Sequence, residues 1–362
     1  MVDPISVASP QIGDEERREV DRVLASGMLA QGPEVAAFER EFADALVDGM
    51  TCVATNSGTS GAHLGLLACG IGPGDEVIVP SFTFAATANA VALTGATPVF
   101  ADIEPDHFCL SADAVEAART ARTAAIMPVH LFGHPAPMTE LVQVSEKHGL
   151  RIFEDAAQAH GARLGGRLVG TWGDFSMFSL YPTKNMTSGE GGMTACRDET
   201  IARNMRLLRN QGMEQRYANE VIGFNARMTD IHAAIGRVQL RRLPAWTQQR
   251  RATAATFDSA LEGVVVPPVA ADAEHVYHQY TVRVPDDRDG FARALQAEHG
   301  VGTGVYYPTP VHRLPSYDLS LDLPETERAA AEVLSLPVHP ALSDEDVDRI
   351  VLAVNSVAKA GA

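Results

Sequence analysis

The sequence has few basic residues and no long apolar run, and these two absences exclude several classes of function. Lysine and arginine together number 29, against 46 aspartates and glutamates, which gives a formal net charge of −17. Nucleic acids and anionic membrane surfaces need an extended basic surface, so we expect neither as a partner. No apolar stretch approaches the roughly 20 residues that span a bilayer. An anionic small molecule remains possible, because it needs only a local basic pocket.

Cysteine is also scarce, and the N-terminus lacks the basic and apolar regions of a signal peptide. The cysteines are scattered without a CxxC pair, which predicts free thiols in a reducing cytoplasm and no metal site. They are Cys52, Cys69, Cys109 and Cys196. Two nucleotide fingerprints are missing as well, since no GK[ST] follows the small-residue turn at 57–60 and GxGxxG does not occur. The sequence therefore excludes a Walker-type site and a dinucleotide fingerprint.

Short apolar runs alternate with helical segments between residues 50 and 200. Most of these runs are apolar throughout, which is typical of strands buried on both faces by helices. The pattern predicts an α/β sandwich around a mostly parallel sheet, with ligands bound at the carboxyl ends of the strands. The expected strands are 76–80, 97–103, 124–129, 151–155, 174–179 and 191–196. The expected helices between them are 60–69, 83–94, 111–120 and 137–148.

The two ends of the chain read differently from this central part. Amphipathic helices are predicted at 14–26 and 34–47. A long helix is predicted from Thr229, a plausible N-cap, to Leu243, because Pro244 limits its continuation. We therefore place a domain boundary near residue 245, with a large domain over 1–245 and a small α+β domain over 246–362. The small domain is expected to hold helices at 246–262, 289–299, 325–334 and 343–358, a strand at 275–284 and an extended segment at 301–308.

Two ionisable residues follow predicted strands at the edge where a ligand is expected. Lys184 lies in a loop of small and polar residues, where desolvation would lower its pKa and make it a Schiff-base former. A lone lysine at such a position is more often a surface residue. Asp155 ends its strand and could keep the ring nitrogen of pyridoxal phosphate (PLP) protonated, or it could cap a following helix. Gln158 would reach the hydroxyl oxygen of that ring, whereas His160 is better explained as a packed histidine.

Other segments offer an anion site and a flat aromatic surface. The residues Ser57-Gly58-Thr59-Ser60 open a predicted helix, where free N–H groups and the helix dipole suit a phosphate. An ordinary Ser/Thr N-cap is the alternative. Phe84 follows a strand and could lie on a planar cofactor or simply pack in the core. Asn225 and Arg227 precede the helix at Thr229 and could bind an anion, or they could form a solvated turn.

The order and co-occurrence of these features are more informative than any one of them. The phosphate turn, Phe84, the segment EDAAQAHGA (154–162), Ser179, Lys184 and the turn GFNARM (223–228) follow one another along the chain. In this order the chain resembles the DegT/DnrJ/EryC1/StrS family of PLP-dependent aminotransferases. The resemblance covers nearly the whole chain, and the Lys184 segment and EDAAQAHGA are its most specific parts. Further matching segments are 27–43, 72–105, 128–138 and 333–351.

The resemblance implies the aspartate-aminotransferase-like fold, type I of the PLP-dependent transferases, and a homodimer with active sites at the subunit interface. It implies that Lys184 bonds covalently to PLP, that Asp155 pairs with the ring nitrogen and that Gln158 contacts the phenolic oxygen. The remaining cofactor contacts that it implies are Gly58, Thr59, Ser60 and Ser179 at the phosphate, Phe84 on the ring, and Asn225 from the other subunit. Tyr181 stands where the family often has histidine, and Ser60-Gly61-Ala62 replaces larger residues at the helix start.

The resemblance also implies the reaction. L-glutamate is the expected amino donor, and a nucleotide-linked 4-keto or 3-keto deoxyhexose is the expected acceptor. The expected substrate contacts are Tyr181, Arg227, Tyr307 and His312. Three further arginines, Arg206, Arg209 and Arg216, either offset the acidic surface near a diphosphate or belong to a solvated helix face.

Three alternatives to this reaction stay open. The first is a cyclitol ketone as the acceptor. The second is a PLP-dependent sugar dehydratase, whose family members carry histidine at the lysine position, so Lys184 argues against it. The third is a non-catalytic regulator that keeps the fold without turnover. The complete set of cofactor residues argues against this third alternative.

Overall fold

Seven strands form the central sheet of the computed structural model, which describes residues 3–361. Their order is β1-β9-β8-β5-β4-β2-β3. The pairs from β8 to β3 are parallel, whereas β9 is antiparallel to both of its neighbours. The mostly parallel sheet expected from the sequence is thereby confirmed. The strands are β1 (Thr51–Thr55), β2 (Glu76–Pro80), β3 (Thr97–Ala101), β4 (Thr123–Ile126), β5 (Arg151–Asp155), β8 (Phe175–Ser179) and β9 (Gly192–Cys196).

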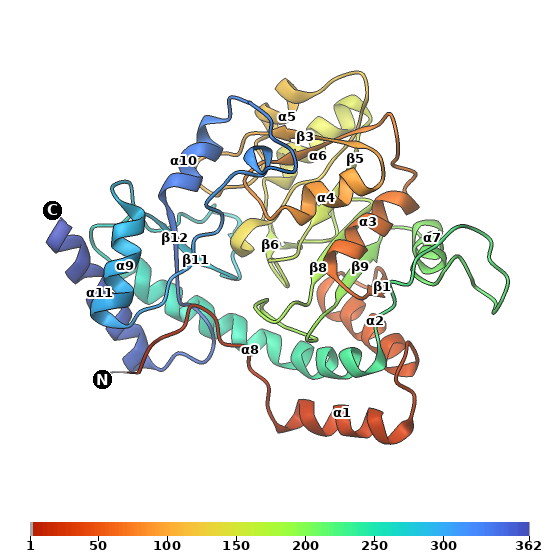
Figure 1. Cartoon of the computed structure of the whole chain (residues 1–362), viewed down its shortest axis with the longest axis horizontal. Helices are drawn as coiled ribbons and strands as arrows, with labels where there is room; N and C mark the ends of the chain where they lie inside the picture. The colour runs from red at the N-terminus through yellow and green to blue at the C-terminus, as the bar shows by residue number, and fades with distance from the viewer. Residues whose placement is uncertain (1–2, 362) are drawn as a thin grey trace.

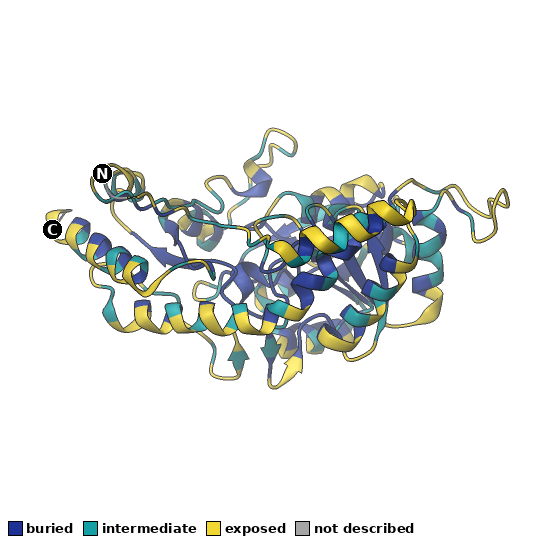
Figure 2. Ribbon diagram, turned by 90° about the horizontal axis from the view of Figure 1, so that it is seen from below, coloured by how far each residue is buried: buried dark blue, intermediate teal, exposed yellow. Residues whose placement is uncertain are grey.

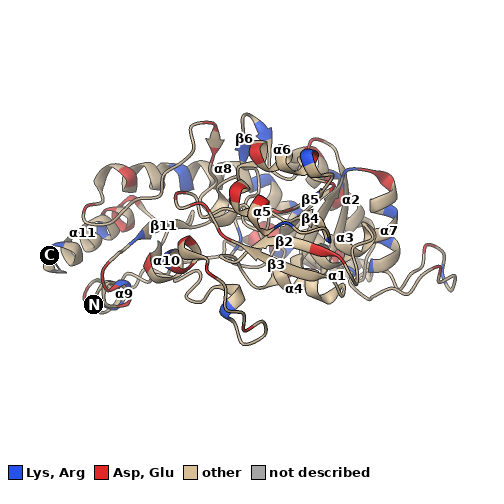
Figure 3. Cartoon of the chain, turned by 90° about the horizontal axis from the view of Figure 1, so that it is seen from above, with Lys and Arg blue, Asp and Glu red and all other residues tan. Residues whose placement is uncertain are grey.

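Helices cover both faces of this sheet (Figure 1). Strand β2 shows why its residues are apolar throughout, because Val77 and Val79 pack into a cluster with α3 and α4, whereas Ile78 packs into a cluster with α5 and α6. Buried residues fill the sheet between the two layers (Figure 2), and acidic and basic residues lie mostly on the outer helices and loops (Figure 3). The helices of this part are α1 (Asp14–Ser26), α2 (Pro33–Leu46), α3 (Gly58–Ala68), α4 (Ala86–Leu93), α5 (Ala112–Ala118), α6 (Met138–His148) and α7 (Glu199–Arg209).

The longest helix, α8 (Asp230–Ala260), runs through Pro244. Thr229 caps its N-terminus as expected, since its hydroxyl accepts a hydrogen bond from the His232 N–H. The prediction that the helix ends at Leu243 is wrong. Proline removes one backbone hydrogen bond, but packing holds the helix on both sides of it. Leu240 lies in the core below the large sheet and Phe257 in a second core, so α8 joins the two.

The second core surrounds the two-stranded sheet of β11 (Tyr280–Arg283) and β12 (Val333–Leu336). The strand expected at 275–284 begins only at Tyr280, and strands β12 and β1 were not predicted. Helices α9 (Arg288–His299), α10 (Pro324–Glu332) and α11 (Asp344–Gly361) match the remaining predicted segments. Ile5 packs into this core although it belongs to the N-terminal segment. The division at residue 245 falls inside α8 and stays a prediction.

Smaller elements complete the structure. A three-stranded sheet consists of β6 (Arg163–Leu164), β7 (Arg167–Leu168) and β10 (Ala273–Glu274), and two 3-10 turns lie at Leu131–Gly133 and Val311–Arg313. No helix within residues 3–361 has the length and apolarity needed to cross a membrane. In the same part of the chain, no group of three or more His, Cys, Asp or Glu side chains is arranged to hold a metal ion.

Candidate active site

A cavity of about 620 Å³ opens at the carboxyl ends of the parallel strands. Asp155 is the last residue of β5 and Ser179 the last of β8, while Phe84 follows β2 and Gly58 follows β1. This is the edge of an open α/β sheet where ligands bind. The structure brings nine of the predicted site residues to the wall of this cavity: Gly58, Thr59, Phe84, Asp155, Gln158, Ser179, Tyr181, Lys184 and Tyr307.

Asp155 presents a buried carboxylate to the cavity. Thr87 donates a hydrogen bond of 2.7 Å to its Oδ2, and the Ala157 N–H donates one of 3.1 Å to its Oδ1. Burial raises the pKa of Asp155 above its usual value, although the Thr87 hydrogen bond opposes this shift. No helix follows Asp155 directly, so the alternative that it only caps a helix does not apply. A cation placed in this cavity would favour the ionised carboxylate.

Lys184 follows β8 in the loop that borders the same cavity. Burial lowers the pKa of its amine to about 8, while the opposite charge of Asp155 raises it. About half of this amine is therefore unprotonated near pH 8 and about a tenth at pH 7, and the unprotonated amine is the nucleophilic form. His160 is fully buried between Phe42 and Phe178, and burial lowers its pKa to about 3, in agreement with a packed histidine.

Gln158 is fixed by two hydrogen bonds. Its Oε1 accepts from the Phe132 N–H at 2.7 Å, and its Nε2 donates to the Tyr307 hydroxyl at 3.1 Å. Tyr307 comes from the second half of the chain, and its ring centroid lies 6.0 Å from that of Phe84. Phe84 is 59% exposed, so it does not pack in the core. Two aromatic rings and one amide therefore line the same cavity as Lys184 and its loop neighbours, Tyr181 and Thr183.

The turn before α3 has the form of a capped helix N-terminus that still borders the cavity. The Ser57 Oγ accepts from the Ser60 N–H at 3.1 Å, and the Ser57 and Ser60 hydroxyls lie 3.0 Å apart. Ser60 does not line the cavity, whereas Gly58 and Thr59 do. A Cβ at Gly58 would lie 3.1 Å from the Cβ of Ser179, so glycine allows the helix start to approach the end of β8.

Three further predicted residues lie away from the cavity of their own chain. Asn225 is exposed, and Arg227 donates a hydrogen bond of 2.8 Å to Asn210. His312 is buried, with its Nδ1 2.6 Å from the Ser81 hydroxyl. The structure therefore does not bring His312 to the ligand side.

Each of the three additional arginines already has a partner within its own chain. Arg209 is buried and donates to Glu39 and to the Ala54 carbonyl. Arg206 pairs with Glu199, and Arg216 lies over the ring of Tyr217. Arg206 therefore matches the solvated helix face that the sequence left open, whereas Arg209 is buried and Arg216 lies in the loop after α7.

Several cavity residues were missed at the sequence level. Thr87 stands one helical turn after Phe84 in the segment PSFTFAATANA, so its position on α4 was a usable signal. Glu190 lies in the run Gly189-Glu190-Gly191-Gly192, and such a run by itself is weak evidence for a site. His278 and Gln279 come from the loop before β11, and no local pattern linked them to Lys184. The other missed residues with polar side chains or rings are Thr83, Phe132, Thr183 and Tyr306.

Known proteins with the same arrangement are numerous. The family model of the DegT/DnrJ/EryC1/StrS aminotransferase family matches residues 10–355. A dTDP-3-amino-3,4,6-trideoxy-alpha-D-glucose transaminase of Streptomyces venezuelae is 43% identical over 358 residues, covering 96% of this chain and 94% of the relative.

Solved structures agree with this match. S. venezuelae DesV in complex with a ketimine intermediate superimposes with a TM-score of 0.92 at 43% identity, covering 96% of this chain and 95% of that chain. The PLP-form of a putative sugar aminotransferase, Spr1654 of Streptococcus pneumoniae, gives a TM-score of 0.93 at 29% identity, covering 99% and 100%. With this sheet, this cavity and these relatives, the chain belongs to the DegT/DnrJ/EryC1/StrS family and is a PLP-dependent aminotransferase of fold type I.

Proposed function

We propose that the cavity binds PLP through Lys184 and Asp155 and moves an amino group from L-glutamate to a nucleotide-linked 4-keto or 3-keto deoxyhexose. The observation that carries the proposal is the placement of these two side chains in one cavity, at the ends of neighbouring parallel strands. The amine has a lowered pKa and the carboxylate is buried with one hydroxyl donor. These are the two groups that a cofactor with an aldehyde and a basic ring nitrogen needs.

The other cavity residues fit the same cofactor. PLP supplies, when bound, a ring that withdraws electrons from the carbon bearing the amino group. Asp155 would hold a proton on the ring nitrogen, and Gln158 would donate to the phenolic oxygen. Gly58, Thr59 and Ser179 would bind the phosphate at the N-terminus of α3, where the helix dipole favours an anion. The amine of Lys184, once free, would take a proton from the donor's α-carbon and return it to the cofactor carbon bonded to the same nitrogen.

Within residues 3–361, the cavity wall offers surface for a sugar ring but no lysine or arginine for a diphosphate apart from Lys184. Phe84, Tyr181, Tyr306 and Tyr307 supply aromatic surface for a sugar ring, and Lys184 is the sole Lys or Arg among the described residues that line the cavity. A diphosphate would therefore be bound by basic residues outside this wall. The name of the S. venezuelae relative, a transaminase of a dTDP-linked sugar, supports this acceptor class. A cyclitol ketone, which has no diphosphate, is the second candidate.

In this proposal, the basic residues that bind the diphosphate come from a second subunit that shares the active site. The segment between α7 and α8 projects from the body of the molecule (the green loop in Figure 1) and carries Ile222, which is 94% exposed, and Phe224. An apolar segment left uncovered by its own chain favours an interface. We propose that it docks on a second copy, so that Asn225 contacts the PLP phosphate and Arg227 the substrate diphosphate of the partner site. Arg227 has the geometry for phosphate recognition.

The dimer proposal is tested by complementation. Lys184→Ala removes the amine, and Asn225→Asp places a negative charge beside the phosphate, so each variant alone should be inactive. After subunit exchange, mixed dimers hold one site with both native residues and should recover part of the activity. If exchange is shown by mass spectrometry and activity does not return, Asn225 acts within its own subunit.

The acceptor is tested by binding to the PLP form. An aminated nucleotide sugar and the same amino sugar without its diphosphate are titrated at low and high salt. We expect the nucleotide form to bind at least tenfold more tightly, with the preference reduced by Arg227→Ala and by salt. Equal affinity for the two ligands would favour the cyclitol acceptor. Bleaching of the cofactor's yellow colour by glutamate would distinguish an aminotransferase with either acceptor from a non-catalytic regulator. Formation of an aminated product would distinguish the aminotransferase from a dehydratase.

A further inference from the structure

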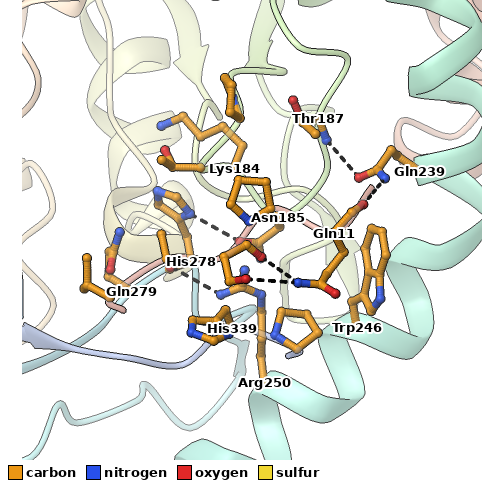
Figure 4. Close-up of a pocket in the computed structure, with 17 residues that line it drawn as sticks. Gln11, Lys184, Asn185, Thr187, Gln239, Trp246, Arg250, His278, Gln279 and His339 are labelled. Atoms are coloured by element: carbon orange, nitrogen blue, oxygen red, sulfur yellow. Dashed lines mark hydrogen bonds between the residues drawn. The ribbon is translucent and has the colours of Figure 1, made fainter. Parts of the chain in front are cut away.

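A histidine that the reaction as proposed does not use lies beside Lys184. His278 is 6% exposed and lines the large cavity as well as a smaller one between α8, the N-terminal segment and the Lys184 loop. Figure 4 shows this smaller cavity, with the His278 ring next to the Lys184 side chain. The two residues are 94 positions apart in the sequence, so their proximity depends on the packing of the segment before β11 against the loop after β8.

Asn185 fixes the orientation and the tautomer of this ring. The Asn185 Nδ2 donates to the Val276 carbonyl at 3.0 Å, and since a carbonyl only accepts, the amide oxygen must face the ring. His278 Nδ1 lies 3.2 Å from that oxygen and therefore carries the ring hydrogen. In the neutral ring the lone pair is then on Nε2. This nitrogen has no hydrogen-bond partner within residues 3–361, and the ring borders both cavities.

The surroundings of His278 keep the ring neutral. The ionisable groups that act on it are Lys184 from the loop after β8, Arg250 from α8, His160 from the loop after β5 and His275 from its own segment. Each of them disfavours a positive charge on the ring, and burial lowers the pKa of His278 well below its usual value. A neutral imidazole with a free lone pair is a hydrogen-bond acceptor, and the amine of Lys184 is a donor in both of its protonation states.

We propose that His278, oriented by Asn185, is a positioning residue that accepts a hydrogen bond from the Lys184 amine whenever this amine is not bonded to the cofactor. One N–H of the amine would then point at Nε2, which directs the nitrogen lone pair toward the substrate side of the cavity. This inference rests on the proposed role of Lys184. It explains how the long, flexible side chain of Lys184 can return the proton at a defined position each time a substrate amine has displaced it from the cofactor.

The test measures Lys184 in the cofactor-free protein and not only in the turning-over enzyme. The rate of PLP uptake, followed by visible absorbance, is recorded against pH for the parent and for His278→Phe, His278→Gln and Asn185→Leu. Borohydride reduction and peptide mapping identify the labelled lysine in every variant. In the parent the uptake rate should rise with a midpoint near the pKa of the free amine, about 8.

His278→Phe removes the acceptor that stabilises the ammonium form, so the midpoint should move to lower pH while turnover falls about tenfold, the effect of one lost hydrogen bond. A merely structural role would lower turnover without moving the midpoint. His278→Gln offers a carbonyl acceptor and should keep the parent midpoint. Asn185→Leu should act like His278→Phe, but it should have no effect on the midpoint in the His278→Gln background.

Two outcomes separate this inference from the proposed function. A label on a lysine other than Lys184 would overturn the proposed function. A label on Lys184, with an unchanged midpoint in His278→Phe, would overturn the role of His278 alone. If His278→Phe does not fold, Asn185→Leu is compared in the parent and in the His278→Gln background. A shift of the pH midpoint that persists in His278→Gln cannot act through the histidine ring and would overturn the role of His278.

Discussion

The hydroxyl of Thr87 is expected to hold Asp155 in its ionised form, and Thr87→Val tests this. Thr87 is 1% exposed and Asp155 5%, and the Thr87 Oγ1 lies 2.7 Å from the Asp155 Oδ2. Valine keeps the shape of threonine but has no hydrogen to donate. One hydrogen bond to a charged group is worth about 1.5–3 kcal/mol. Its loss should therefore weaken the preference for the carboxylate by roughly 10- to 150-fold, leaving the Ala157 N–H as its remaining partner.

The assay compares turnover and cofactor affinity in Thr87→Val and in a matched control. We expect kcat for 2-oxoglutarate formation from glutamate to fall at least about tenfold, and PLP to bind more weakly, because the ring nitrogen loses part of its counter-charge. Thr94→Val is the control, since Thr94 is buried at the end of the same helix and its hydroxyl donates to the Val91 carbonyl at 2.7 Å. If the two variants show the same kcat within twofold, Thr87 does not tune Asp155.

Two further predictions concern stability. In the cofactor-free protein, the pKa of Lys184 is lower than in the unfolded chain, so burial of its charged form destabilises the folded state. This destabilisation is complete below pH 8 and disappears as the pH rises toward 10.5. Lys184→Met should therefore raise the free energy of unfolding by up to about 3 kcal/mol at pH 7, with a gain that shrinks above pH 8 in denaturant titrations; a gain independent of pH would contradict this origin. Pro244→Ala restores a donor inside the continuous helix α8 and should raise that free energy by about 1–3 kcal/mol in the same titrations; a fall would contradict the reasoning.

The sheet and its ligand-binding edge could be predicted because their signals are local. A strand buried on both faces needs a short run of apolar residues whatever follows it, so β2 and β5 could be predicted from their own residues. The parallel order then places the last residue of β5 and the loop after β8 at one edge, which brought Asp155 and Lys184 together before any contact was known.

The limits of the sequence show at Pro244 and at the ends of the strands. Pro244 carries a true local preference against helix, but packing of Leu240 in one core and Phe257 in another outweighs it. Strand β1 (TCVAT) was missed because threonines at both ends shorten its apolar run, and β12 (VLSL) was missed because it continues the chain of α10 with no turn residue between them.

What the sequence by itself determined is therefore the α/β plan, the two ionisable groups at its edge and the family that uses them. Only the tertiary structure decided which distant residues complete the cavity. Thr87 meets Asp155 across 68 positions and Gln158 meets Tyr307 across 149, whereas His312, in a similar polar segment, turns inward to Ser81. Such contacts depend on how two cores dock and on which face of a loop is buried, and no pattern within a few residues of sequence encodes either.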